Sequence, residues 1–263
     1  MDSKFRADPY NFNNKLIKVN DIINIMKKLN INDFKVNDLS LYQKAMIHKS
    51  YCELPEYKEF NYPGEGCLPL QKEAYETLEF LGDSILGSIV SSYIYERFHL
   101  IHNQNEGFLT KLKIRLVCGE NLCKFSKNIT LEKHLIISKH IEEKCSGRNN
   151  SNILEDIFEA FIGAIFLDHN YEVVKDFLIK VIEKHADFTD ILLKDNNYKD
   201  QISRYFQQTF KIYPKYETIK VDEMFQSKIL KESSIIAVGN GVSKKKAEQD
   251  VSKNALIHFN VIT

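Results

Sequence analysis

The sequence contains no run of about 18 apolar residues, no apolar stretch near its start and no CxxC cysteine pair. The first absence excludes a membrane-spanning helix, and the second excludes a secretory signal. The five cysteines are scattered and odd in number, which argues against both a disulfide framework and a zinc site. We therefore expect free thiols, a reducing compartment and no membrane partner.

The chain also lacks net charge, because its 36 Lys and Arg residues are matched by 36 Asp and Glu residues. Taken alone, this balance argues against a protein that simply coats nucleic acid. The charge is unevenly distributed, however: residues 198–263 hold 11 basic and 7 acidic residues, and the preceding part is acidic by the same margin. A basic C-terminal module on a mildly acidic body indicates two domains with different roles.

What the sequence does contain is helical periodicity over most of its length, within a hydrophobic content of 43%. No strand-like alternation precedes residue 214, so residues 15–186 predict an all-α domain. A flexible N-terminus is expected at residues 1–14, and the prolines and glycines of residues 53–70 predict an insertion loop. The helical segments are 15–29, 39–51, 75–98, 107–126, 152–167 and 171–184.

The pattern changes after a linker expected at residues 187–197. A helix at residues 201–210 is followed by three short β-leaning runs and a final helix that Ser243 caps. Residues 198–263 therefore predict a small α+β domain of order α-β-β-β-α. The β-leaning runs are 215–221, 225–230 and 234–238.

Acidic residues stand on two of the expected helices. Glu76, Glu79 and Asp83 fall within an arc of about 60° on one helix, and Asp156 and Glu159 are one turn apart on another. Like charges at these spacings repel each other, and a cation between them removes the penalty. Carboxylates are hard ligands, so the implied cation is Mg²⁺, with Mn²⁺ as a substitute, an arrangement typical of phosphodiester cleavage. The alternative is a solvated acidic face on each helix.

At these residues the sequence resembles the ribonuclease III family. The run Glu76-Thr-Leu-Glu-Phe-Leu-Gly-Asp-Ser-Ile-Leu86 is similar to the family signature, and Asp156-Ile-Phe-Glu-Ala160 is similar to its second acidic motif. The segments Glu106–Val117 and Ala45–Tyr51 resemble two further motifs, and all four occur in the family's order. The resemblance covers residues 20–186 and implies a helical catalytic domain.

The resemblance assigns a role to each acidic residue. Glu76 matches a position in the catalytic valley, where it orients RNA or a metal-bound water, and Glu106 matches another valley position. Phe80 lies at the family's dimer contact, with packing in its own core as the alternative. The implied metal ligands are Glu79, Asp83, Asp156 and Glu159.

The C-terminal module resembles a double-stranded-RNA-binding domain. Its Gly239-Asn-Gly-Val-Ser-Lys-Lys-Lys-Ala-Glu-Gln249 segment is close to that domain's final motif, and Tyr213-Pro-Lys-Tyr216 resembles the entry to its first strand. The positive end of the last helix would face phosphates. The implied RNA-binding residues are Lys244, Lys245, Lys246, Gln201 and Arg204.

Three features depart from the family pattern. The usual Gly-Pro-x-His loop after the first strand is replaced by the shorter, acidic Val221-Asp-Glu-Met-Phe225. The first helix of the module has Ser203-Arg204 in place of Gln-Glu. The insertion at residues 53–70 is either a mobile surface loop or a loop that contacts RNA or a partner.

The resemblance implies a homodimeric, Mg²⁺-dependent endoribonuclease that cleaves double-stranded RNA and leaves 5′-phosphate and 3′-hydroxyl ends with short 3′ overhangs. The alternative is a non-catalytic protein that sequesters RNA duplexes, although the presence of all four acidic ligands favours the enzyme. A helical scaffold without RNA would leave the C-terminal resemblance unexplained. The expected location is the cytoplasm or nucleus, or the host cytoplasm for a viral protein.

Overall fold

Helices α3 (Glu76–Ile94) and α7 (Ser151–Asp168) supply the centre of the N-terminal core in this computed structural model. The structure describes residues 7–193, 197–231 and 234–262. The apolar stripe of α7 is fully buried, and that of α3 is buried apart from the half-buried Leu81. The two stripes consist of Leu154, Phe158, Phe161 and Ile165 on α7 and of Leu78, Leu81, Ile85 and Ile89 on α3. Each stripe lies opposite the acidic residues of its helix. On α7 the burial extends around the helix to Glu159.

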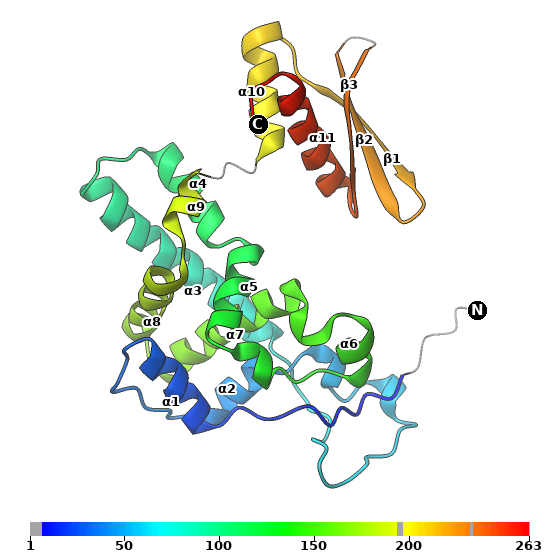
Figure 1. Ribbon diagram of the computed structural model, residues 1–263. Coiled ribbons are helices and arrows are strands. Elements are labelled where there is room, and N and C mark those ends of the chain that lie inside the picture. The colour runs from blue at the N-terminus through cyan, green and yellow to red at the C-terminus, as the bar shows by residue number, and fades with distance from the viewer. Residues whose placement is uncertain (1–6, 194–196, 232–233, 263) are drawn as a thin grey trace. The chain divides into compact units, whose positions relative to one another are not determined.

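The chain divides into two units, Met1–Ile191 and Leu192–Thr263. The first is helical, and the second combines two helices with an antiparallel sheet, as Figure 1 shows. This order confirms the fold class expected from the sequence. The remaining helices of the first unit are α1 (Val19–Lys28), α2 (Leu39–Ala45), α4 (Glu106–Leu116), α5 (Gly119–Asn128), α6 (Lys139–Lys144), α8 (Tyr171–His185) and α9 (Phe188–Leu193), and a π-helical turn at Tyr95–Leu100 follows α3.

One expected helix is divided in two. The pattern at residues 107–126 predicts a continuous helix, whereas α4 ends at Leu116 and α5 begins at Gly119. Cys118 between them is extended, and the carbonyl of Arg115 accepts hydrogen bonds from the Asn121 amide at 2.6 Å and the Cys118 thiol at 3.2 Å. These side chains satisfy the free carbonyl at the end of α4, so the chain turns and starts a new helix. Similarly, the expected helix at residues 39–51 ends at Ala45.

Residues 7–14, part of the segment expected to be flexible, contact the helical unit. The side-chain amides of Asn11 and Asn14 both donate to the carbonyl of Ile137, at 3.1 and 2.9 Å, and both residues are buried. These bonds hold the segment against the loop before α6. Residues 1–6 of the expected flexible segment lie outside the described residues.

The second unit packs its two helices on one face of a three-stranded sheet (Figure 1). Two glycines of β3 allow this close approach: a Cβ on Gly239 would lie 2.2 Å from the backbone nitrogen of Val251, and one on Gly241 would lie 2.4 Å from that of Ala247. The elements are α10 (Tyr198–Phe210), β1 (Lys215–Val221), β2 (Met224–Lys231), β3 (Ser234–Gly241) and α11 (Lys244–His258), with sheet order β1-β2-β3.

The expected linker at residues 187–197 begins with a helix. Phe188 of α9 packs against Phe98, with ring centroids 5.9 Å apart, and the Arg115 guanidinium donates to the carbonyl of Ile191. This first part of the linker therefore contacts the helical unit, and residues 194–196 lie outside the described residues. All five cysteines are free, and none of the described helices combines the length and apolar character needed to cross a bilayer.

Candidate active site

The candidate site is built on a contact between two helix backbones. A Cβ on Gly82 of α3 would lie 1.8 Å from the carbonyl oxygen of Glu159, and one on Gly163 of α7 would lie 2.3 Å from the carbonyl oxygen of Leu78. Neither position tolerates a side chain without separating the helices. Because α3 and α7 touch at these glycines, the acidic residues on the two helices come together.

The carboxylates gathered there repel one another. Burial raises the pKa of Glu159 to about 8, and the charges of Asp83, Glu155, Glu79 and Asp156 add to this rise. Burial is also the first cause of the raised pKa of Glu79, followed by the charge of Asp156. Each of these shifts disfavours the ionised carboxylate. The site therefore favours either a proton or a cation.

Asp156 is held in place by a residue that the sequence analysis missed. The buried hydroxyl of Tyr75, which precedes α3, donates a hydrogen bond of 2.7 Å to Oδ2 of Asp156. Burial raises the pKa of Asp156, whereas this hydrogen bond and the charge of Lys49 oppose the rise. In the sequence, the role of Tyr75 is indicated only by its position directly before Glu76 of the acidic motif.

The donor set fits a hard divalent cation by its chemistry. Within the described parts of the chain, no three side chains are placed as a ready-made ligand cluster. Mg²⁺ does not require one, because it keeps several waters and is typically held by one or two carboxylates. Glu159 is only 9% exposed and accepts no hydrogen bond from the described residues. Such a buried carboxylate needs a compensating positive charge or a proton.

The structure brings together the five acidic residues that the sequence predicted. Glu79, Asp83, Asp156 and Glu159 interact as described, and Glu76 lies exposed in the first turn of α3, where its charge acts on Glu79 and Asp156. Glu106, at the start of α4, instead accepts a hydrogen bond of 2.7 Å from Thr110. Glu155 also belongs to this group, because its charge acts on Glu79 and Glu159, although no pattern in the sequence indicated it.

Phe80 does not pack in its own core. Its side chain is 78% exposed between Glu79 and the half-buried Leu81. Core packing, the alternative considered for this residue, is thus excluded. An exposed aromatic ring beside an acidic face is available to a second protein surface.

The predicted RNA-binding lysines lie together at the start of α11. Lys244, Lys245 and Lys246 occupy its first turn and are exposed, and Ser243 caps the helix by accepting a hydrogen bond of 3.3 Å from the Lys246 backbone nitrogen. The positive end of the helix dipole and the three ammonium groups thus occupy the same surface, an arrangement suited to phosphate binding.

Gln201 and Arg204, also predicted to bind RNA, lie on α10. Gln201 is half-buried, and Arg204 is exposed and forms an ion pair of 2.9 Å with Asp200. The start of α10 is joined to α11 through Lys199, whose ammonium group lies 2.7 Å from the Glu248 carboxylate. Arg204 must therefore exchange or share its present partner to contact a phosphate.

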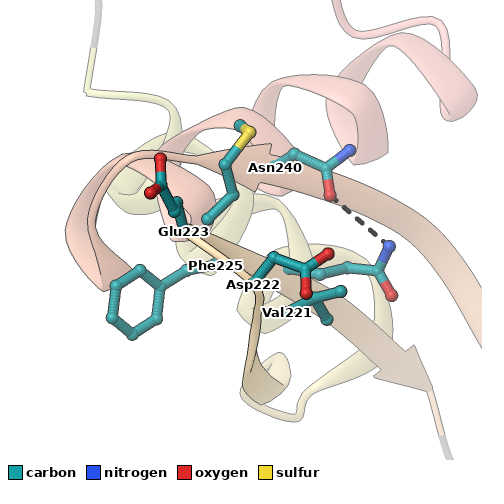
Figure 2. Close-up of a pocket in the computed structure, with 7 residues that line it drawn as sticks. Val221, Asp222, Glu223, Phe225 and Asn240 are labelled. Atoms are coloured by element: carbon teal, nitrogen blue, oxygen red, sulfur yellow. Dashed lines mark hydrogen bonds between the residues drawn. The ribbon is translucent and has the colours of Figure 1, made fainter.

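The turn between β1 and β2 confirms the shortened loop seen in the sequence. Val221 pairs with Met224, leaving Asp222 and Glu223 as a two-residue turn, with Asp222 in the left-handed region at a φ of 53°. Both carboxylates lie at this turn (Figure 2), and together with Asn240 they line a hollow of about 490 Å³. The tip therefore presents negative charge where the family pattern has Gly, Pro and His.

The insertion at residues 53–70 is tied to the helical unit by tyrosine hydroxyls. Tyr51 donates to the carbonyl of Leu68 in the insertion at 2.7 Å, and Tyr57 of the insertion donates to the carbonyl of Ser50 at 3.1 Å. The segment contains four Glu residues and one Lys residue. This negative charge disfavours contact with RNA phosphates.

A helical unit with facing carboxylates, followed by an α-β-β-β-α unit, defines the architecture of a ribonuclease III with an RNA-binding domain. Residues 38–185 match the family described as ribonuclease-III-like. Ribonuclease 3 of Staphylococcus aureus is 34% identical over 227 residues, which cover 84% of this chain and 86% of that protein. This chain belongs to the ribonuclease III family, and the resemblance found in its sequence is confirmed.

Two further similar proteins differ in how much of their own length this chain covers. A probable ribonuclease 3 of Acanthamoeba polyphaga mimivirus is 36% identical over 236 residues, which cover 87% of this chain but only 39% of that protein. The solved nuclease domain of ribonuclease III from Campylobacter jejuni is 29% identical, with a TM-score of 0.49, and the match covers 63% of this chain and 98% of that domain.

Proposed function

We propose that this protein is an Mg²⁺-dependent endonuclease that hydrolyses double-stranded RNA, with Mn²⁺ as a substitute cation. The observation that carries the proposal is the meeting of the α3 and α7 carboxylates at the Gly82–Gly163 contact. A divalent cation held there would supply Lewis-acid chemistry for activating water and for stabilising the leaving 3′ oxygen. The products are 5′-phosphate and 3′-hydroxyl ends with short 3′ overhangs.

The residues of the acidic cluster have different roles in the proposed hydrolysis. Tyr75 fixes the orientation of Asp156, and the exposed Glu76 orients RNA or a water molecule at the edge of the cluster. Burial of Glu159 excludes bulk water from one side of the site. The residues that would hold the cation are Glu79, Asp83, Asp156 and Glu159.

The C-terminal unit binds the duplex in this proposal. Lys244, Lys245 and Lys246 contact phosphates, and Gln201 and Arg204 supply contacts from α10. Residues 15–186 form the catalytic domain, residues 187–197 the linker and residues 198–263 the RNA-binding domain. The acidic turn at Asp222 and Glu223 contributes no phosphate contact, because its charge has the wrong sign.

The active form is a homodimer in which Phe80 contacts the partner subunit. Its 78% exposure supports this role, because a large apolar surface of this kind favours burial. A two-fold contact would give two active sites, one for each RNA strand.

The free cysteines support a reducing compartment, either the cytoplasm or nucleus or, for a viral protein, the host cytoplasm.

The proposal is tested by incubating the purified protein with a long RNA duplex and Mg²⁺. We expect short duplex products, no cleavage with excess EDTA, and no cleavage of the same length of duplex DNA. Glu172→Gln, at an exposed residue of α8, is the control variant and should cleave normally. Duplex binding without cleavage by the wild-type protein in Mg²⁺ or Mn²⁺ would support the sequestering protein instead.

A further inference from the structure

Glu155 is an acidic residue of the site that the four implied ligands do not include. It lies one turn before Glu159 on α7, and residues at this spacing are neighbours on a helix surface. Its side chain is half-buried, and the charges of Asp156 and Asp83 act on it. Glu155 therefore extends the carboxylate cluster on the side of Asp83 and Glu159.

The carboxylate of Glu155 occupies a space that a glycine leaves open. A Cβ on Gly119, the first residue of α5, would lie 2.2 Å from Oε2 of Glu155, 2.7 Å from Cδ and 2.9 Å from Oε1. Any other residue at position 119 would displace this carboxylate. Because the chain breaks at Cys118 and α5 starts at Gly119, it is a glycine that lies against Glu155.

Neither Glu155 nor Glu159 has a hydrogen-bond donor among the described residues. Glu159 is nine-tenths buried and faces Asp83 and Glu155. A buried carboxylate such as that of Glu159 is normally hydrogen-bonded. These oxygens thus point to a ligand that lies outside the protein.

We propose that Glu155 is a positioning residue for the divalent cation, and that its carboxylate accepts hydrogen bonds from the cation's water shell beside Asp83 and Glu159. The inference rests on the proposed function. Mg²⁺ gives up its waters reluctantly, so the waters that stay on the cation need hydrogen-bond acceptors around the site. Outer acceptors of this kind typically contribute about 10- to 100-fold in metal affinity.

The test is calorimetric titration of the full-length protein with Mg²⁺ and with Mn²⁺, without RNA. Glu155→Gln keeps the shape of the side chain and should weaken the affinity about tenfold. Gly119→Ala leaves Glu155 unchanged but displaces its carboxylate, so it should produce a similar loss. The double variant should lose no more than either single variant, because both changes remove the same interaction.

Two further variants make the result specific. Glu120→Gln removes a charge next to Gly119 whose carboxylate is already paired with Lys124 at 2.7 Å, and it should bind the cation as the wild type does. Glu159→Gln removes an implied direct ligand and should lose more affinity than Glu155→Gln. A purely structural role for Glu155 would change the melting temperature of the metal-free protein without changing the affinity.

The outcomes separate this inference from the proposed function. No cation binding by the folded wild-type protein would overturn both. If Glu159→Gln binds the cation weakly but Glu155→Gln binds it as the wild type does, the proposed function is retained and the role of Glu155 is overturned. Equal losses in Glu120→Gln and Glu155→Gln would reduce the effect to net charge and also overturn it. Undiminished affinity in Gly119→Ala would refute the positioning of Glu155 by Gly119.

Discussion

The hydroxyl of Tyr75 and the carboxylate of Asp156 connect the start of α3 to α7 through a hydrogen bond of 2.7 Å. We predict that Tyr75→Phe lowers the free energy of unfolding by about 1 kcal/mol and the affinity for Mg²⁺ by about tenfold. The reason is that Asp156 keeps its charge but loses the donor that orients it. Chemical denaturation and calorimetric titration measure the two effects.

Tyr42→Phe is the matched control for this change. Tyr42 is fully buried and donates a hydrogen bond of 2.9 Å to Asp168, at the other end of α7. Its loss should lower stability by a similar amount without altering the affinity for Mg²⁺. Equal effects of the two variants on metal affinity would show that Tyr75 acts only through the stability of α7.

Glu159→Gln should separate catalysis from stability. Cleavage should fall at least about 100-fold, as expected for loss of a metal-ligand environment, while binding to duplex RNA stays near wild type. In EDTA the variant should melt at a higher temperature than the wild type, because a neutral amide replaces a buried carboxylate that four other carboxylates repel. Calorimetry measures the melting temperature, and a cleavage assay measures the rate of RNA hydrolysis. Near-normal cleavage would refute the assignment of Glu159 as a metal ligand.

Lys244→Ala combined with Lys245→Ala should weaken duplex binding and reduce its dependence on salt. Each lost phosphate contact should lower the log–log salt slope by about 0.9, the value for a DNA duplex. Lys27→Ala with Lys28→Ala is the control, because it removes the same charge from the end of α1. The measurement is fluorescence anisotropy at several salt concentrations. If both double variants show the same slope, the contacts lie elsewhere.

Phe80→Ala should convert the dimer to a monomer in light scattering, since it removes the most exposed aromatic ring of α3. Leu167→Ala removes a 51% exposed apolar side chain from α7 and should leave the dimer intact. A wild-type protein that is monomeric at all concentrations would refute the proposed assembly. A dimer that resists Phe80→Ala would confine the error to this residue.

Asp222→Asn combined with Glu223→Gln should strengthen binding to duplex RNA several-fold. Both changes keep the shape of the turn, and asparagine tolerates the left-handed backbone of position 222. Removal of two negative charges reduces repulsion by phosphates where the tip approaches the duplex. Glu217→Gln on β1 is the control. An unchanged affinity would show that the tip stays away from the RNA.

The sequence predicted the helices and their acidic faces because each helix carries its own pattern. Leu154 and Phe158 are buried on one side of α7, and Asp156 and Glu159 follow from the same periodicity. Tyr75 and Glu155 were missed for a physical reason. Their roles depend on contacts with α7 and α5 respectively, and a pattern within one segment contains no information about another.

The same reason explains the errors in the fold. Asn121 ends α4 by bonding to Arg115, a polar contact that apolar periodicity does not register. Asn11 and Asn14 bond to Ile137, which lies 126 and 123 residues further along the chain. Polar residues near a terminus usually indicate flexibility, and only the distant partner changes that interpretation.

At the contact between Gly82 and Gly163, backbone atoms rather than side chains set the closest approach of the two acidic helices. The nearest atoms across this contact belong to the backbones of Glu159 and Leu78. A cavity made elsewhere in the core can thus lower the melting temperature while the helix axes stay at the same distance. Thermal stability and active-site geometry can therefore vary separately during evolution, except at these two positions, where a single added methyl group alters both.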